Sequence, residues 1–338
     1  MNNQVANVCV ALLLAAGLSA VTVFAQQAAA RDFDAETRAA LQSAKNAAGF
    51  EFLGTLARTC LLPQSGGEDT RDNLPDYVTN PAKAPARETW YAEPARVYDN
   101  LYFIGGKVQS AWALTTSEGI ILIDTIFPYN SEELVVGGLR KLGLDPTTVK
   151  YVIVTHAHGD HDGGAKLMQD RFGSRIIMGG PDWDRIENSV NRYPNGKPKR
   201  DMVALDGQKI VLGDAAVTLA LTPGHTSGTV SMFFQVRDNG TPLMVAYSGG
   251  TAFNFPNDVP HFDTYIYTQR KMAELAASLN AGVIMSNHSE FDNAVTKIKM
   301  LAARRPGEPH PFDLGRNAVL RYFKTSGECA QEARLKLL

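Results

Sequence analysis

One short polar segment constrains this chain more than any other feature. Residues 155–161 read THAHGDH, so three histidines and one aspartate fall within six residues. The segment directly follows the apolar run 151–154, which is typical of a buried strand. Side chains two positions apart on an extended chain point the same way. His156 and His158 can therefore bind one metal ion together.

The rest of the segment offers ligands to a second ion. Gly159 makes a turn easy, and Asp160 and His161 follow it. A His-rich loop that is merely polar surface is the alternative. Four ligand-type side chains with small spacers, placed at the end of an apolar strand, favour metal binding over that alternative.

Two other histidines occupy comparable positions in the chain. His225 follows an apolar strand in LTPGHT, and His288 follows another in VIMSNH. Functional residues of α/β proteins gather where strands end and loops begin, so we expect these histidines beside the first three. Of the remaining two, His310 is expected on the surface, whereas His261 is a candidate for the pocket mouth.

Predicted strands and helices alternate in two successive halves of the chain. Strands are expected at residues 97–105 (as a hairpin), 111–116, 119–124, 151–154, 175–178, 209–212, 216–221, 230–236, 243–247 and 283–286. Helices are expected at residues 131–142, 264–279 and 291–302 and over most of residues 315–338, and residues 160–172 are expected to pass from a loop into a helix. This pattern suits two sheets packed face to face with helices outside, which is a four-layer α/β arrangement.

The first 25 residues differ from the rest of the chain. Residues 8–25 carry no charge, and small residues lie at the cleavage positions before Gln26, as in a secretory signal peptide. We therefore expect residues 1–25 to be a signal peptide and the protein to be secreted or periplasmic. The absence of Lys and Arg from residues 1–7 counts against this interpretation. An uncleaved membrane anchor is the alternative.

Residues 26–89 form the next predicted segment, an N-terminal extension. Residues 34–48 are rich in helix formers, and residues 50–62 suit a short packed helix. Residues 63–87 are rich in Pro, Asp and Gly and predict a long connection. Residues 90–338 are then expected to form the catalytic domain.

The cysteines are consistent with export. Cys9 lies within the expected signal peptide, so Cys60 and Cys329 remain as a pair. In an oxidising compartment these two can form a disulfide between the start and the end of the mature chain. Two buried free thiols are the alternative. If the disulfide forms, the extension must lie against the C-terminal helix.

Charge limits the classes of partner. The chain has 33 Lys and Arg against 35 Asp and Glu, a formal charge of -2. It has no long basic run, which argues against a protein that binds nucleic acid through its phosphates. We expect a small-molecule substrate, no nucleic acid, and no membrane association after signal cleavage. The composition predicts no particular oligomeric state.

The motif THAHGDH resembles that of the metallo-β-lactamase superfamily, and the resemblance covers most of residues 90–305. Residues 223–229, 238–247 and 286–288 are most similar to the third subclass of metallo-β-lactamases, whose ligands are all His and Asp. The resemblance implies an αββα sandwich, here with an N-terminal helical extension, and two zinc ions. It implies that the first ion is held by His156, His158 and His225. It implies that the second is held by Asp160, His161 and His288.

Two departures from the family pattern concern the substrate. Glyoxalase-type thioesterases carry an Asp after the hairpin that bridges both metal ions, whereas this chain has Gly250 at that position. The lactamase subclass also lacks this bridging Asp. That subclass places small hydroxyl residues nearby to hold a substrate carboxylate, which Gly250 and Ala252 cannot do. Ser248, Thr251 and Asn254 are the candidates to replace them, and Tyr247 is a further candidate for contact with the substrate.

The expected function is that of an exported di-zinc hydrolase. It would open a cyclic amide of the β-lactam type by attack of a zinc-bound hydroxide. Asp160 and His161 are the expected catalytic residues, with Asp160 orienting the proton of the hydroxide. Aromatic side chains are candidates for the pocket rim, with core packing as their alternative: Trp183, Tyr247, Phe253 and Phe255.

Other activities remain open at this point. A lactonase, esterase or amidase of the same fold is the main alternative, because a metal centre alone does not choose between activated cyclic carbonyls. A single-metal iron oxidase and a non-enzymatic zinc-binding or partner-binding protein are further alternatives.

Overall fold

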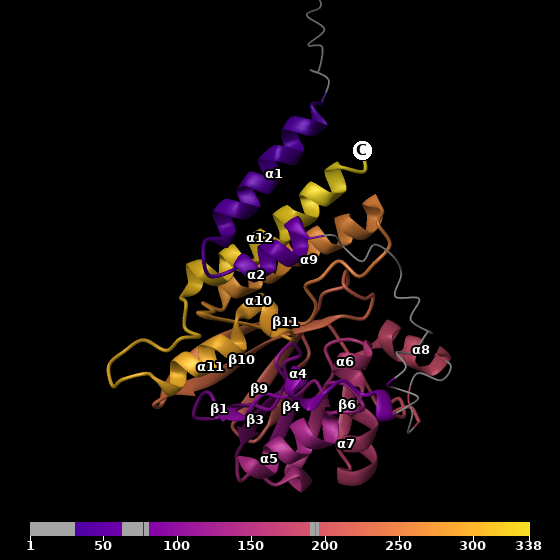
Figure 1. The fold of residues 1–338 in the computed structure, drawn as a ribbon, viewed down its shortest axis with the longest axis vertical. Helices are drawn as coiled ribbons and strands as arrows, with labels where there is room; N and C mark the ends of the chain where they lie inside the picture. The colour runs from indigo at the N-terminus through magenta and orange to yellow at the C-terminus, as the bar shows by residue number, and fades with distance from the viewer. Residues whose placement is uncertain (1–30, 63–76, 78–80, 190–192, 194–195) are drawn as a thin grey trace, which may run out of the picture. The chain divides into compact units, whose positions relative to one another are not determined.

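Two β-sheets make up the centre of the protein (Figure 1). The computed structural model describes residues 31–62, 77, 81–189, 193 and 196–338. The expected signal peptide and most of the connection expected at 63–87 lie outside these residues. Residues Phe33–Leu338 form one unit by their internal contacts. Within the described part of the chain, no helix is both long enough and apolar enough to span a membrane.

The first sheet has seven strands in sequence order, antiparallel from β1 to β4 and parallel from β4 to β7. Its strands are β1 (Ala95–Arg96), β2 (Leu101–Phe103), β3 (Trp112–Thr116), β4 (Gly119–Ile123), β5 (Val149–Ile153), β6 (Arg175–Gly179) and β7 (Met202–Ala204). The second sheet has five strands in the order β12-β11-β10-β9-β8. They are β8 (Lys209–Leu212), β9 (Ala215–Leu221), β10 (Val230–Asp238), β11 (Thr241–Ser248) and β12 (Val283–Ser286).

The inner faces of the two sheets share one apolar core. Trp112 of β3 and Ile153 of β5 meet residues such as Phe234 of β10 and Tyr247 of β11 in this core. Side chains alternate between the two faces of a strand, so every second residue of these strands points into the shared core. Burying this surface is the main stabilising contribution to the sandwich.

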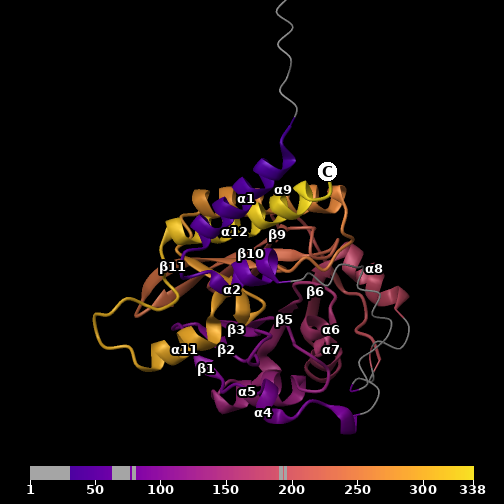
Figure 2. The same cartoon turned by 45° about the horizontal axis from the view of Figure 1, so that its top comes forward.

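Helices cover the outer faces of the sheets (Figures 1 and 2). One layer packs on the first sheet and contains η3 (Glu132–Val136), α5 (Gly137–Lys141), α7 (Ala165–Phe172) and α8 (Gly180–Asn188). The layer on the second sheet contains α1 (Phe33–Ala48), α2 (Leu53–Leu56), α9 (Val259–Ser278) and α12 (Arg316–Leu335). The remaining helical elements are η1 (Ala57–Leu61), η2 (Pro81–Lys83), α4 (Arg87–Trp90), η4 (Pro146–Thr148), α6 (Gly159–Asp162), α10 (Ser289–Asp292) and α11 (Ala294–Ala302). The predicted four-layer αββα arrangement is confirmed.

Where the elements differ from the prediction, the causes are local. The helix expected at 264–279 begins at Val259, because the Asp258 carboxylate accepts a hydrogen bond from the His261 amide at 3.0 Å and caps the helix. Residues 160–172, expected to pass from a loop into a helix, form most of two helices, α6 and α7, which the pair Gly163 and Gly164 separates. Helix α8 and strand β7 were not predicted.

The extension packs against the C-terminal helix. Helix α1 buries small side chains, among them Ala40, Ala44 and Ala48, in the layer that also contains α12. Cys60 of η1 forms a disulfide with Cys329 of α12. The predicted disulfide is therefore confirmed, as is the expected contact of the extension with the C-terminal helix. The boundary expected at residue 90 stays a prediction.

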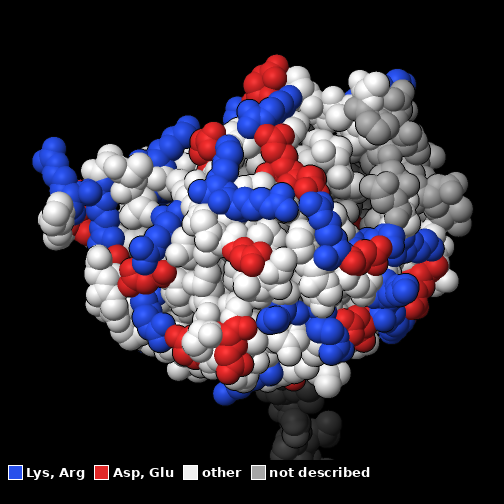
Figure 3. Space-filling model, turned by 90° about the horizontal axis from the view of Figure 1, so that it is seen from below, with Lys and Arg blue, Asp and Glu red and all other residues white. Residues whose placement is uncertain are grey.

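Charged side chains are mixed on the face shown in Figure 3. Lys and Arg lie beside Asp and Glu across this face, and the two signs are not separated into large areas. Oppositely charged side chains also form ion pairs, such as Arg87–Glu133 and Arg200–Asp184. Exposed pairs of this kind stabilise the fold only slightly.

Candidate metal centre

The six predicted ligands lie where strands end. His156 and His158 follow β5, and Asp160 and His161 lie in α6 immediately afterwards. The remaining two come from the second sheet, where His225 lies in the loop between β9 and β10 and His288 follows β12. The structure gathers these residues into two sets of three, and within each set the candidate ligand atoms lie within 4.8 Å of one another.

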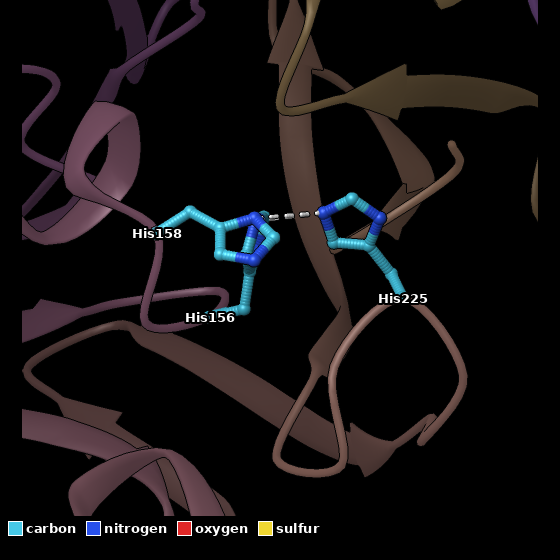
Figure 4. A group of neighbouring side chains, drawn as sticks. All are labelled: His156, His158 and His225. Atoms are coloured by element: carbon cyan, nitrogen blue, oxygen red, sulfur yellow. Dashed lines mark hydrogen bonds between the residues drawn. The ribbon is translucent and has the colours of Figure 1, made fainter. Parts of the chain in front are cut away.

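The first set contains His156, His158 and His225, all of them buried. Figure 4 shows their rings pointing toward one another from two loops. The Nε2 atom of His225 lies 3.0 Å from Nε2 of His156 and 3.1 Å from Nδ1 of His158. Three imidazole nitrogens thus converge on one small volume.

Backbone carbonyls determine which ring nitrogens carry protons in this set. Nδ1 of His156 lies 2.9 Å from the carbonyl oxygen of Gly249, and Nδ1 of His225 lies 2.6 Å from that of Ala252. A carbonyl oxygen only accepts, so each Nδ1 must donate, which leaves a lone pair on each Nε2. Two lone pairs that face each other at 3.0 Å repel unless a cation lies near both. The donor set therefore fits a metal ion.

The second set contains Asp160, His161 and His288. An Asp160 carboxylate oxygen lies 3.5 Å from Nε2 of His161 and 3.3 Å from Nε2 of His288, and these two nitrogens are 3.0 Å apart. On the other side of its ring, His161 donates through Nδ1 to the Asp124 carboxylate at 2.9 Å. This hydrogen bond leaves Nε2 of His161 available as a ligand atom.

The pKa shifts of the ligand side chains favour binding of a dication. Burial, together with the neighbouring imidazoles, lowers the pKa of His156 and His225 well below the usual value, so both are neutral at pH 7. Burial alone would raise the pKa of Asp160, but the adjacent His161 and His288 hold it well below its usual range. Burial likewise opposes protonation of His161, yet Asp160 and Asp124 raise its pKa to about 8.

Two buried aspartates support the ligands, and the sequence analysis did not identify them. Asp124, at φ 61°, accepts hydrogen bonds from the Thr155 amide at 2.7 Å and the Thr155 hydroxyl at 2.9 Å in addition to that from His161. Asp182 accepts bonds from the amides of Ala157 and Gly228. The ending IDT of the strand before the metal motif was a possible signal for Asp124, whereas Asp182 had none.

Gly250 leaves no room for a bridging side chain. A Cβ atom added at this position would lie 2.6 Å from Cβ of His225 and 2.8 Å from its Cγ. Any larger residue would have to displace the ligand ring. The two ligand sets are therefore not joined by a carboxylate from this position.

The four candidate substrate-binding residues lie in different surroundings. Tyr247 is fully buried in the core between the sheets. Ser248 and Thr251 are also buried, with their hydroxyls 3.2 Å apart, and the Thr251 hydroxyl lies 2.9 Å from that of Tyr322. These three side chains therefore point into the protein. Of the four, Asn254 is among the residues that line a cavity beside His225 in the described part of the chain.

This cavity has a volume of about 400 Å³ and reaches the first ligand set. Its lining includes His225, Arg185, Asn254, Phe255 and His261. The expected position of His261 at a pocket is thus found. Phe255 is 5% exposed, so core packing accounts for most of its surface.

The other two aromatic candidates and His310 are part of the core. Trp183 and Phe253 are buried, which agrees with the packing alternative. His310 was expected on the surface, and that prediction is wrong, because the side chain is 4% exposed. Its ring stacks on Tyr98 at 4.1 Å, and its Nε2 lies 2.9 Å from the carbonyl oxygen of Val97.

Comparison with known proteins bears on this site. The profile of the metallo-beta-lactamase superfamily matches residues 104–286. An N-acyl homoserine lactonase of Bacillus thuringiensis is 27% identical over 175 residues, which cover 44% of this chain and 67% of the lactonase. A hydroxyacylglutathione hydrolase of Acidiphilium cryptum is 38% identical over 84 residues, covering 25% of this chain and 30% of that one. The crystal structure of a subclass B3 metallo-β-lactamase of Bradyrhizobium japonicum superposes with a TM-score of 0.57 and 25% identity, covering 69% of this chain and 90% of that one.

Proposed function

Since this chain belongs to the metallo-β-lactamase superfamily, we propose that it is an exported di-zinc hydrolase that opens a cyclic amide of the β-lactam type. The matching proteins are named as hydrolases, among them a metallo-β-lactamase and an N-acyl homoserine lactonase. The observation that carries the finer proposal is the pair of separate His and Asp ligand sets without a bridging residue at Gly250.

The chemistry of the donors favours zinc. Neutral imidazoles with one carboxylate are typical zinc ligands, and a set of three leaves a further coordination position open. Zinc bound to His156, His158 and His225, and to Asp160, His161 and His288, would lower the pKa of a nearby water to about 7 and polarise a carbonyl oxygen. No covalent nucleophile from the protein is required.

The chain's own residues have defined tasks in such a reaction. Asp160 is ionised at pH 7 and its side chain is 18% exposed, so its second oxygen can accept a hydrogen bond from a water and thereby orient the proton of that water. His225 borders the cavity, so a substrate in the cavity can place its carbonyl at the first ligand set. Asn254 lies in the same wall and can donate its amide N–H to that substrate.

A lactone is the second candidate substrate. The hydroxyls of Ser248 and Thr251 are turned inward, so neither anchors the carboxylate that a β-lactam antibiotic carries. A lactone has no such carboxylate, and a curated relative is named as an N-acyl homoserine lactonase. This candidate differs from the first in substrate but not in the metal chemistry.

A direct comparison of substrates tests the proposal. The mature, zinc-loaded protein is assayed with a chromogenic cephalosporin and with an N-acyl homoserine lactone, and bound zinc is measured in the same samples. We expect kcat/KM of at least about 10⁴ M⁻¹s⁻¹ for the cephalosporin. His156→Ala should lose both zinc and turnover, while His261→Gln, outside the ligand sets, should keep its zinc. Full turnover by a zinc-free protein would contradict the proposal, and turnover of the lactone alone would replace the first substrate with the second.

Export is part of the same proposal. Disulfides persist in oxidising compartments, so the Cys60–Cys329 bond supports export through the signal peptide expected at residues 1–25. Expression of the full chain in a bacterium, followed by mass measurement of the periplasmic product, tests this. We expect a product that begins near Gln26. A full-length chain in the membrane fraction would instead indicate an anchor.

A further inference from the structure

We propose that the N-terminal extension positions a ligand of the second set. In this proposal Gly54 and Thr55 of α2 hold the short helix α10, and α10 in turn fixes His288, the residue directly before it. The inference rests on the two-ion site of the proposed function. It assigns to the extension a role in metal binding that the ligand motif does not indicate.

Thr55 makes the most direct polar contact. Its hydroxyl donates to the carbonyl oxygen of Phe291 at 2.8 Å, across a sequence separation of 236 residues. The Thr55 side chain is fully buried, so water cannot replace this bond. A second contact lies nearby, where the Arg58 guanidinium pairs with the Glu290 carboxylate. Both contacts end on α10.

Gly54 brings the two backbones together. A Cβ atom added at Gly54 would lie 1.9 Å from the carbonyl oxygen of Glu290, which is a backbone atom that cannot rotate away. Only glycine permits this approach. The extension therefore packs directly on the main chain of α10, and Figure 1 shows α2 beside α10 and α12.

Helix α10 is a single turn and depends on such contacts. Residues adjacent to α10 in the sequence hold it from one side, since Asp292 accepts hydrogen bonds from the amides of Ser286 at 2.7 Å and Ala294 at 2.9 Å. The extension holds its outer side.

His288 forms the N-terminal boundary of this turn, with its ring centre 6.0 Å from that of Phe291. On its other side His288 forms an isolated bridge with Gln109, and the Ser289 amide donates to the carbonyl oxygen of Val108 at 2.8 Å. These contacts and those of the extension together set the position of the ligand, so a loss of either set should displace it.

His288 is the ligand most sensitive to such a shift. Its side chain is 21% exposed, whereas that of its partner His161 is fully buried and bonded to Asp124. A ligand with less surrounding packing relies more on the segment that carries it. The second ligand set should thus weaken first when α10 loosens.

The extension is itself anchored to a long helix. The Cys60–Cys329 disulfide joins η1 to α12. Phe52, which is fully buried, packs edge-on against Tyr322 of α12 with ring centres 5.4 Å apart. These anchors give α2 a fixed position, so it can transmit that position to α10.

Cobalt(II) titration of the metal-free full chain tests the proposal, because visible absorbance reports each ion as it binds. His288→Ala identifies the titration step that belongs to the second set. Thr55→Val keeps the shape of the side chain but removes the hydrogen bond, and we expect it to raise the dissociation constant of that step about tenfold. The dissociation constant of the other titration step should stay unchanged, and Thr55→Ser should have the wild-type dissociation constant at both steps.

A matched control removes a comparable hydroxyl elsewhere in the extension. Thr37→Val deletes a bond to the carbonyl oxygen of Phe33 within α1, and it should leave both titration steps unchanged. Wild-type binding of Thr55→Val, or equal weakening of both steps, would overturn the positioning role while the two-ion site stands. A wild-type protein that binds fewer than two ions would overturn the proposed function and this inference with it. Gly54→Ala provides a second variant, with the same selective loss expected.

Discussion

Replacing Asp182 by asparagine tests whether one buried carboxylate organises the first ligand set. Asp182 is 1% exposed and accepts three hydrogen bonds. They come from the Ala157 amide at 2.7 Å, the Thr226 hydroxyl at 2.8 Å and the Gly228 amide at 3.1 Å. Ala157 lies between the first two ligands and Thr226 directly follows the third. One side chain thus joins both ligand loops.

The expected loss of stability in Asp182→Asn follows from the hydrogen-bond donors and acceptors around this side chain. Asparagine has a single acceptor oxygen, which can keep the bonds to Ala157 and Thr226. Its amino group then faces the Gly228 N–H, and two donors meet without an acceptor. A hydrogen bond to a charged group contributes about 1.5–3 kcal/mol, but the neutral amide is less costly to bury than a carboxylate. Burial raises the pKa of Asp182, which reflects that cost. We expect a net loss of about 2 kcal/mol in the free energy of unfolding.

Two measurements check this prediction. Urea unfolding of the metal-free protein gives the stability change, and zinc titration against a competing chelator gives the affinity of the first set, which should fall about 10- to 100-fold. Asp184→Asn is the matched control, because Asp184 lies on the same helix but is exposed and pairs with Arg200. If Asp182→Asn binds the first zinc ion as tightly as the control does, the carboxylate does not position the ligand loops.

Three further predictions concern pH, the disulfide and Gly250. Because the pKa of His161 is raised to about 8, a proton competes with the second metal ion below that pH, and zinc titrations at pH 6, 7 and 8 should show affinity rising about tenfold from pH 6 to 7 and by a smaller factor from pH 7 to 8. Cys60→Ser combined with Cys329→Ser should lower the free energy of unfolding in urea by about 2–4 kcal/mol; an unchanged midpoint would contradict this. Gly250→Ala places a Cβ atom 2.6 Å from His225 and should cost about 1–3 kcal/mol of stability, measured in urea, while weakening the first zinc ion.

The ligands were predictable because their signal is local. The spacing of His156 and His158 and the position of His288 after an apolar strand need no knowledge of distant contacts. Asp182 and Thr55 act across long sequence separations, and nothing near them in the chain indicates their partners. His310 was misplaced for the same reason, since its stacking partner lies more than two hundred residues away.

Tyr247 is a different case, because the alternation of side chains along its strand already indicated that it is buried. Along β11, Val245 and Tyr247 face the core between the sheets, whereas Ala246 faces the helix layer. Alternation along the predicted strand therefore placed Tyr247 inward. Residue type alone indicated a substrate contact for Tyr247, whereas the periodicity indicates core packing, which the structure confirms.

The loop after β11 explains why this site lacks a bridging residue. Gly249 approaches β10 so closely that an added Cβ atom would lie 1.9 Å from the carbonyl oxygen of Val230. The same approach brings the Gly249 carbonyl oxygen to His156, where it orients the ligand ring. At the next position, contact with His225 excludes a side chain. The backbone at these two positions thus orients the ring of His156 and leaves no room for a side chain beside His225.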